Sequence, residues 1–459
     1  MTLPPELLQA ISSPGGGKIG LVLGAGCSVE APTNIPVSSV CSNEIHRRLV
    51  ADGVLDNGDC SNPCDLSVLA DAVFNKRNSQ RDVVERLCDY GLKLATPNQG
   101  YWIAAALLCE GAISSVVTLN YDLALSTALS ALGADKVVGV VECPEDLSHQ
   151  KNINVYYLHR NANAADPELW VLRTSALNDE WRGRWEPIIA TKVLAAPIVV
   201  FAGIGTPVGV LIESTKFLRN ALPETTKLYL AGPGDMGNSQ FFEALSLDPA
   251  RYIQSGWGQL MNALSQRLSK EQVAQLEQAA QRKIHEDNLT DEDIASLLNA
   301  LQKLGVVKFG KLRAGWLLHD KPYRPFEAST PGLLADLLLA LATMARVSGA
   351  EAVIVDDGSV EFRRDGRVAA SFVLASGCGH RGKQAVEAVV ELRRSQYCTC
   401  PAVLVSGTSA SWTTPPTPPK DIIQGDVSKQ DILRGPITLP LFHISELREN
   451  HDLIRQVVP

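Results

Sequence analysis

Residues 18–36 read KIGLVLGAGCSVEAPTNIP. The first six residues are almost entirely apolar and do not alternate with polar ones, which predicts a strand buried on both faces. The strand ends in Gly24 and Gly26, and small polar residues such as Ser28 follow. Glycine allows another group to approach the backbone closely, and a helix N-terminus favours negative charge. This stretch therefore predicts a strand–turn–helix unit that can cradle a phosphate, with a tight turn and no ligand as the alternative.

Further apolar runs of the same kind follow, each separated from the next by a helical pattern. They lie at residues 113–119, 154–159, 197–203 and 227–231. Buried strands that alternate with helices indicate an α/β fold with a doubly wound parallel sheet of the Rossmann type. In such a sheet, ligands bind outside the carboxyl ends of the strands.

The composition is that of a globular protein with more than one domain. The chain has 459 residues, of which 45% are hydrophobic and 20% charged, and its formal net charge is -8. An acidic chain is a poor candidate for direct nucleic-acid binding. No run reaches the roughly 18 apolar residues of a membrane span, and no secretory signal stands at the start. Ten cysteines follow no disulfide pattern. We expect a cytoplasmic protein with mostly reduced thiols and no membrane association.

Three regions are expected along the chain. Residues 1–283 form the α/β domain, and residues 284–330 form a small helical module that ends in a strand pair, like a winged helix. Residues 331–459 form a C-terminal α+β domain for sensing or assembly. Its strands around Asp356 and Glu361 resemble a restriction-nuclease core, but Leu374-Ala375-Ser376 stands where the metal-binding acid-x-Lys is expected. Such a core would be an inactive, degenerate nuclease.

Polar residues follow several of the predicted strands. The sequence VVTLNYD delivers Thr118, Asn120 and Asp122 directly after a strand, and YYLHR places His159 at the end of another. Asn can donate and accept hydrogen bonds together, and His can take a proton near neutral pH. Asp122 also fits the N-cap of the next helix, and a lone His is often structural. A glycine-rich exit, FAGIGT, ends at Thr206.

An ordinary dehydrogenase of the Rossmann type is disfavoured. The G-x-G-x-x-G spacing is not met, because Val29, Glu30 and Ala31 follow where the third glycine is expected. No acidic residue marks the end of a second strand about 20 residues further on.

Five motifs in this order resemble the sirtuin family over about residues 15–270. They are GAGCS at 24–28 with Ile35–Pro36, Pro97–Asn98, TLNYD at 118–122, LHR with His159, and the exit at 203–206. The family binds NAD and breaks the bond between nicotinamide and ribose. The resemblance implies that Asn120 and His159 are catalytic. It implies a cofactor-binding set of Gly24, Ala25, Gly26, Ser28, Pro36, Thr118, Asp122, Gly203, Gly205 and Thr206.

The chain departs from the sirtuin deacylases in several respects. Residues 161–193 contain no cysteine, whereas the deacylases carry a zinc ribbon after the catalytic His. Val37–Ser38 replaces their aspartate and phenylalanine, and Arg160 replaces the glycine after the His. These changes remove the acyl-lysine peptide site and leave the NAD site. The layout of residues 230–245 and 252–264 is similar to sirtuin-like effector domains of prokaryotic anti-phage systems, which hydrolyse NAD in abortive infection.

The sequence thus predicts an NAD hydrolase (NADase) that produces ADP-ribose and nicotinamide, with NAD as substrate. The resemblance implies a homo-oligomer and a companion defence protein, either an ATPase or Argonaute-like, or a phage component as trigger. A non-catalytic NAD or ADP-ribose sensor or scaffold subunit is the alternative. A protein deacylase or ADP-ribosyltransferase is a further one.

No catalytic metal is expected. Four residues in the C-terminal region offer C-x-H and C-x-C spacings that can ligate a structural zinc. They are Cys378, His380, Cys398 and Cys400. The spacings are unlike those of common zinc fingers, and scattered thiols are the alternative.

Overall fold

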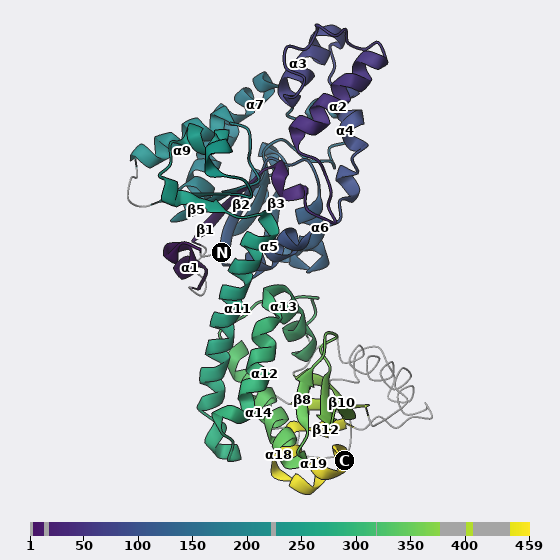
Figure 1. Cartoon of the computed structure of the whole chain (residues 1–459), viewed down its shortest axis with the longest axis vertical. Helices are drawn as coiled ribbons and strands as arrows, with labels where there is room; N and C mark the ends of the chain where they lie inside the picture. Colours follow the sequence, from purple (N-terminus) through teal and green to yellow (C-terminus); the bar gives the residue numbers. More distant parts are fainter. Residues whose placement is uncertain (1–2, 13–17, 222–225, 318, 377–400, 407–440) are drawn as a thin grey trace. The chain divides into compact units, whose positions relative to one another are not determined.

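The computed structural model describes residues 3–12, 18–221, 226–317, 319–376, 401–406 and 441–459 (Figure 1). The chain divides into two compact units, Met1–Arg267 and Leu268–Pro459. Helix α11 (Trp257–Gln281) runs across this division. The predicted domain boundary at residue 283 lies just beyond the end of α11. Residues 284–330 and 331–459 fall together in the second unit.

The first unit is built on a seven-stranded parallel sheet. Its strands are β1 (Ile19–Leu23), β2 (Ile113–Thr118), β3 (Val138–Val141), β4 (Ile153–Tyr157), β5 (Ile198–Ala202), β6 (Lys227–Gly232) and β7 (Tyr252–Gln254). Their order is β3-β4-β2-β1-β5-β6-β7, and every pairing is parallel. The chain builds outward from β1 in both directions, which confirms the predicted doubly wound α/β fold.

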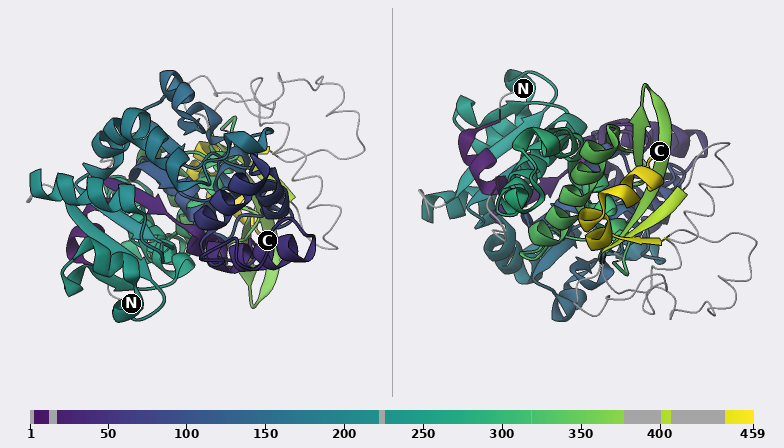
Figure 2. Two further views of the ribbon diagram at one scale, coloured as in Figure 1. Left: turned by 90° about the horizontal axis from the view of Figure 1, so that it is seen from above. Right: turned by 90° about the horizontal axis from the view of Figure 1, so that it is seen from below.

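The apolar run at 19–23 forms the central strand because both of its faces are covered. All five residues of β1 are buried. On one face, alternate strand residues such as Val117, Val199 and Phe201 pack against Trp181 and Trp185. These tryptophans lie in a helical stretch of α7 (Thr174–Glu180), a π-helical turn (Trp181–Trp185) and α8 (Glu186–Ile189). The view from above shows helices on both sides of the sheet (Figure 2, left).

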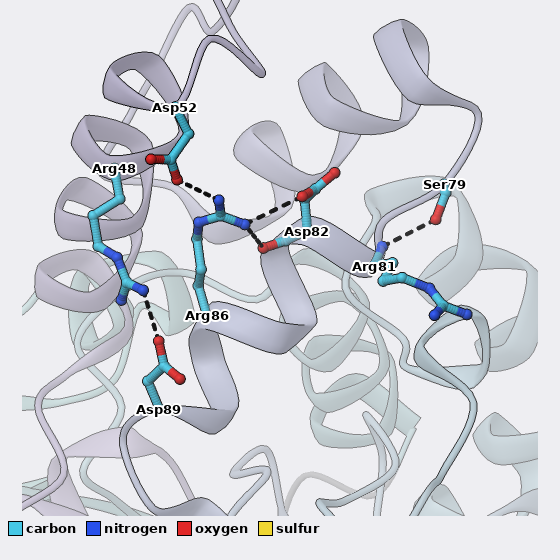
Figure 3. A network of polar contacts seen from close by, with 7 residues as sticks. All are labelled: Arg48, Asp52, Ser79, Arg81, Asp82, Arg86 and Asp89. Carbon is cyan, nitrogen blue, oxygen red and sulfur yellow. Dashed lines mark hydrogen bonds and ion pairs between the residues drawn. The ribbon is translucent and has the colours of Figure 1, made fainter.

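A helical lobe is inserted between β1 and β2. It contains α2 (Ser38–Ala51), α3 (Leu66–Arg77) and α4 (Arg81–Cys88). Two ion pairs connect α2 and its end to α4 and its end (Figure 3): Arg86 binds Asp52 at 2.5 Å, and Arg48 binds Asp89 at 2.7 Å. Arg86 also binds Asp82 within α4 at 3.2 Å. The Arg86 side chain is only 14% exposed, so its pairs hold more firmly than the solvent-exposed pair of Arg48.

The two ends of this lobe meet beside the turn that follows β1. Thr33 Oγ1 donates to the Thr96 carbonyl at 2.7 Å and accepts from the Asn98 amide at 3.0 Å. Asn98 then caps helix α5 (Gln99–Cys109), because its Oδ1 accepts from the Tyr101 amide at 3.1 Å. Capping at Asn98 therefore sets where α5 begins, and with it the position of Tyr101.

The second unit has one core shared by helices and a mixed sheet. Its helices include α12 (Asp291–Lys303), α13 (Gly305–Trp316), α14 (Thr330–Ser348), α18 (Ile444–Glu449) and α19 (His451–Val457). Its sheet has the order β12-β11-β10-β9-β8, with β8 (Glu351–Ile354), β9 (Val360–Arg364), β10 (Arg367–Ser376), β11 (Pro401–Ser406) and β12 (Leu441–His443). α18 and α19 lie against α14 (Figure 2, right).

The prediction that the small helical module ends in a strand pair is wrong. Gly305–Trp316 is helix α13, and Val306, Phe309, Arg313 and Trp316 are buried with the three- and four-residue spacing of a helix. Packing of this face overrides the β-branched and glycine residues that suggested strands. Residues 359–374, whose sequence pattern predicts one strand, belong instead to a hairpin, because Asp365 and Gly366 turn the chain with φ values of 52° and 76°.

Two further sequence predictions concern the second unit. Helix α14 is long and apolar enough to cross a membrane by length and composition, but 61% of its apolar window is buried in the core. Burial of this kind accounts for its apolar character.

Some sequence predictions for the C-terminal region lie outside the described residues. They concern a helix at 384–394, a proline-rich loop at 412–420 and the four candidate zinc ligands. Within the described residues, no group of three or more His, Cys, Asp and Glu side chains could hold a metal ion.

Candidate functional site

The carboxyl ends of four parallel strands meet at one edge of the first sheet. Leu23 at the end of β1 pairs with Thr118 of β2 and with Ala202 of β5, and Thr118 pairs with Tyr157 of β4. β1 is the topological switch point, because β2 lies on one side of it and β5 on the other. Open α/β sheets bind ligands in this crevice. Every predicted site residue lies at the end of one of these four strands or in the segment that follows it.

The turn after β1 and the exit from β5 approach each other too closely for side chains. A Cβ on Gly24 would lie 2.6 Å from the Gly203 carbonyl oxygen, and one on Gly26 would lie 2.8 Å from Gly203 Cα. Gly203 has φ +68°, and a Cβ there would lie 2.5 Å from the Cys27 nitrogen. Contact between the two loops therefore requires glycine at all three positions.

The amides of two of these glycines are already hydrogen-bonded within the protein. Gly24 N–H donates to the Ala202 carbonyl and Gly26 N–H to the Gly203 carbonyl, both at 2.9 Å. Neither amide is therefore free to bind the phosphate that the sequence predicts at this turn. The close approach of β5, which the sequence of the β1 turn does not reveal, accounts for the difference. A role of this turn in holding a diphosphate stays a prediction.

Four buried side chains beneath the turn form one hydrogen-bonded network. Ser28 Oγ lies 2.7 Å from both the Tyr101 hydroxyl and Asp122 Oδ2. Asn120 Nδ2 donates to the Gly24 carbonyl at 3.1 Å, to Tyr101 at 2.9 Å and to Ser28 at 3.2 Å. The network joins residues that come from three different segments of the chain and holds them as a single rigid group.

The capping contact that the sequence allowed for Asp122 is also present. Its Oδ1 accepts from the Ala124 amide at 3.0 Å, at the start of α6 (Ala124–Ala131), while its Oδ2 accepts from Ser28 in the network. Burial raises the pKa of Asp122 above its ordinary value, and its hydrogen bonds from Ser28 and from backbone amides oppose that rise. Thr118 has a local role, since its Oγ1 accepts from the Asn120 amide at 3.1 Å.

Among the predicted site residues, two have a buried polar atom without a hydrogen-bond partner in the part of the chain that the structure describes. These atoms are Asn120 Oδ1 and His159 Nε2. A buried acceptor without a partner is costly unless a ligand or water satisfies it. Both atoms belong to residues at the ends of neighbouring strands, β2 and β4. The crevice therefore contains two unused positions for hydrogen bonds to a bound molecule.

His159 is held in a mostly apolar setting. Burial lowers its pKa from 6.5 to about 4, and a hydrogen bond with the Leu119 backbone partly opposes this shift. The Tyr121 ring lies 5.6 Å from the imidazole and stacks on Trp170 at 5.1 Å. The imidazole is therefore neutral near pH 7, so its two nitrogens comprise one donor and one acceptor.

Arg160 adopts a backbone conformation that favours glycine, with φ +64°. Its guanidinium lies 3.4 Å from Glu180 and 3.6 Å from Glu145, and its side chain is only 15% exposed. These ion pairs offset the strain of the left-handed backbone. The arginine is thus tied to α7 and to the turn at Pro144–His149.

The predicted site residues differ in how far they are exposed to solvent. Gly24, Ser28, Thr118, Asn120 and Asp122 are buried, and Gly205 and Thr206 are exposed; Ala25, Gly26, Pro36, His159 and Gly203 are partly exposed. Sequence reasoning missed Tyr101, which lies within an apolar helix where an aromatic residue predicts only core packing. Its place three residues after the capping Asn98 was the one available signal.

No protein-family model and no curated protein matches the chain. Solved structures of Sir2 homologues are similar to it. One, a mutant bound to ADP-ribose, is 14% identical with a TM-score of 0.35, and the similarity covers 58% of this chain and 97% of that one. A second, bound to NAD, has the same identity and TM-score and covers 57% and 93%. A third, a mutant with 2′-O-acetyl-ADP-ribose, is 15% identical with a TM-score of 0.36 and covers 58% and 97%.

The contact between the two loops predicts that alanine destabilises the protein at Gly203 but not at the nearby Gly205. Gly203→Ala forces a left-handed alanine and a clash with Cys27, so we expect it to lower the free energy of unfolding by about 2 kcal/mol or more. Gly205→Ala is the control: its Cβ would have nothing within 4 Å, so we expect a change within about 0.5 kcal/mol. Chemical denaturation measures both. Equal midpoints for the two variants would contradict the close approach.

The depressed pKa of His159 predicts a loss of stability in acid. Between pH 6.5 and about 4 the unfolded histidine binds a proton that the folded one does not, so unfolding becomes easier as the pH falls. Replacing His159 with Asn should reduce this loss, by on the order of 1–3 kcal/mol at pH 4.5 relative to pH 7. Denaturation midpoints at the two pH values test it. An identical acid loss in the variant would mean that the imidazole is not buried and neutral.

Proposed function

We propose that this crevice binds NAD and that water cleaves the bond between its nicotinamide and ribose, producing ADP-ribose and nicotinamide. The observation that supports this most directly is the pair of unpartnered buried atoms, Asn120 Oδ1 and His159 Nε2, at the switch point of a doubly wound sheet. The choice of NAD follows from the five sirtuin motifs, and similar Sir2 homologues were solved with NAD and ADP-ribose.

The chemistry of glycoside cleavage suits these two atoms. As the C1′–N bond breaks, its electron pair leaves with nicotinamide and positive charge develops on the ribose. A carbonyl oxygen such as Asn120 Oδ1 can accept a hydrogen bond from the attacking water and favours the cationic centre. Water adds to C1′ and releases one proton. Neutral His159 can accept a ribose hydroxyl proton through Nε2 and so assist the charge shift. The ribose oxygen then takes the proton that the water loses, and the imidazolium releases its own proton to solvent.

Several features favour hydrolysis over transfer to a peptide. The segment after His159 begins with the left-handed, ion-paired Arg160 and continues into the helical stretch from Thr174 to Leu194. A peptide that binds by strand addition needs an extended edge in this place. With water as the acceptor, no such edge is needed.

We further propose that the protein is an effector of anti-phage defence that is kept inactive until triggered. A constantly active NADase would harm the cell that makes it. The second unit is the candidate for sensing, self-assembly or contact with a companion ATPase, an Argonaute-like protein or a phage component. Helix α11 gives such a signal a covalent route, because it begins beside the site and continues into the second unit.

NAD consumption by the full chain tests this proposal. We expect the purified protein, alone or after co-expression with its genomic neighbour and phage challenge, to release nicotinamide. Asn120→Ala and His159→Ala should each lower the rate at least about a hundredfold, because each removes a group that acts on the reacting ribose, while NAD still binds. His149→Ala, an exposed histidine on a surface turn, is the control and should match the wild type.

The contradicting outcomes are distinct. Intact NAD under every condition, with tight binding, would favour the sensor or scaffold alternative. Nicotinamide release that depends on an acylated peptide would favour a deacylase. Turnover that survives both substitutions would place the reaction elsewhere in the chain.

A further inference from the structure

The hydrogen-bond donors and acceptors of the buried network allow only one arrangement. The Gly24 carbonyl can only accept, so the nitrogen of the Asn120 amide must face it, 3.1 Å away. That amide nitrogen has no lone pair to offer, so Tyr101 can only accept from it, at 2.9 Å. The Tyr101 proton is then free to go elsewhere.

The remaining links follow in the same direction. The other contact of the Tyr101 hydroxyl is Ser28 Oγ at 2.7 Å, so the tyrosine donates to the serine. Ser28 has one proton of its own, and it donates to Asp122 Oδ2, also at 2.7 Å. Both carboxyl oxygens of Asp122 then accept, since Oδ1 accepts from the Ala124 amide. The Asn120 amide also donates directly to Ser28 Oγ at 3.2 Å, which agrees with the same direction. The order therefore runs from Asn120 through Tyr101 and Ser28 to Asp122.

We propose that Tyr101 is a positioning residue, which fixes the Asn120 amide through this one-way chain and thereby presents Oδ1 to the substrate. Without Tyr101, the amide keeps only its contacts with the Gly24 carbonyl and Ser28 Oγ. It then rotates more readily, so that its nitrogen, a donor that would repel the cationic ribose, can face the substrate. The unpartnered Oδ1 is the consequence of an amide whose other end is fully engaged. Burial raises the pKa of the Tyr101 phenol well above its ordinary value, so the hydroxyl keeps the proton that it donates.

The surroundings of Tyr101 hold its ring independently of the hydroxyl. The residue is 2% exposed, and its ring meets Trp257 edge-on at 5.9 Å. Gly100 leaves room for Trp257, because a Cβ there would lie 2.1 Å from the indole nitrogen. Tyr101→Phe therefore removes one link of the chain and retains the packing of the ring.

The kinetic test rests on the proposed NADase activity. Tyr101→Phe should lower kcat by roughly ten- to a hundredfold and leave KM for NAD within about threefold, since the chain acts on orientation at the reacting centre. Ser28→Ala breaks the next link and should show the same split. Tyr157→Phe is the matched control: its hydroxyl is also buried and bonds a serine, Ser126, at 2.8 Å, so we expect kcat within about twofold of wild type. A wild-type kcat for Tyr101→Phe would overturn the proposal.

A second measurement needs no activity and separates the two proposals. In protein labelled with 15N-asparagine, the Asn120 side-chain amide is assigned by its loss in Asn120→Ala. Its protons should exchange with water at least about tenfold faster in Tyr101→Phe than in wild type or Tyr157→Phe, because a held donor is protected. Faster exchange in a protein that never consumes NAD would sustain the positioning role and reject the enzyme. Unchanged exchange would reject the positioning role, whatever the activity.

Discussion

The close approach of two backbone turns is the constraint on which the rest of the site depends. Gly24 and Gly26 after β1 and Gly203 after β5 leave no space for a Cβ between them. This contact directs the amides of Gly24 and Gly26 toward β5 and leaves the Gly24 carbonyl to accept from Asn120. The glycines therefore position the central asparagine through a carbonyl oxygen. A phosphate-binding role for the same turn would have to use groups other than these two amides.

The loop that follows β1 connects the buried hydrogen-bonded network to helix α11. Ser28 belongs to the network, and two residues later Glu30 accepts from the Gly258 amide at 3.0 and 3.1 Å, in the first turn of α11. A carboxylate is favoured at a helix N-terminus. Since α11 continues into the second unit, one short loop connects the network to the helix that leaves the first unit.

The predictable parts of the fold are those with long, unambiguous patterns. The runs that became β1, β2, β4, β5 and β6 are predominantly apolar because they lie inside a covered parallel sheet. The two edge strands, β3 and β7, were not predicted, since they have only four and three residues and one neighbour each. Helix α13 was mistaken for strands because its valines and glycines favour other structures, and only tertiary packing shows that its buried face is helical.

Some residues of the candidate site could likewise be predicted from the sequence, and others could not. Asn120 and His159 could be singled out because polar residues at strand ends are informative in this fold. Tyr101 could not, because the network that uses its hydroxyl joins segments 73 and 19 residues away. Likewise, the partner of the glycine turn is β5, 175 residues further on, as the contact between Cys27 and Ala202 illustrates. The residue spacing within one motif does not indicate which distant residues it contacts in the fold.

The central claim is that Asn120 Oδ1 and His159 Nε2 are left free for a bound ribose. An experimental structure of the full chain with ADP-ribose, the proposed product, tests this most directly. The account predicts a ribose in the crevice at the end of β1, with its hydroxyls within hydrogen-bond distance of both atoms and the network beneath unchanged. ADP-ribose bound elsewhere, or an Asn120 amide that presents its nitrogen to the ligand, would contradict it.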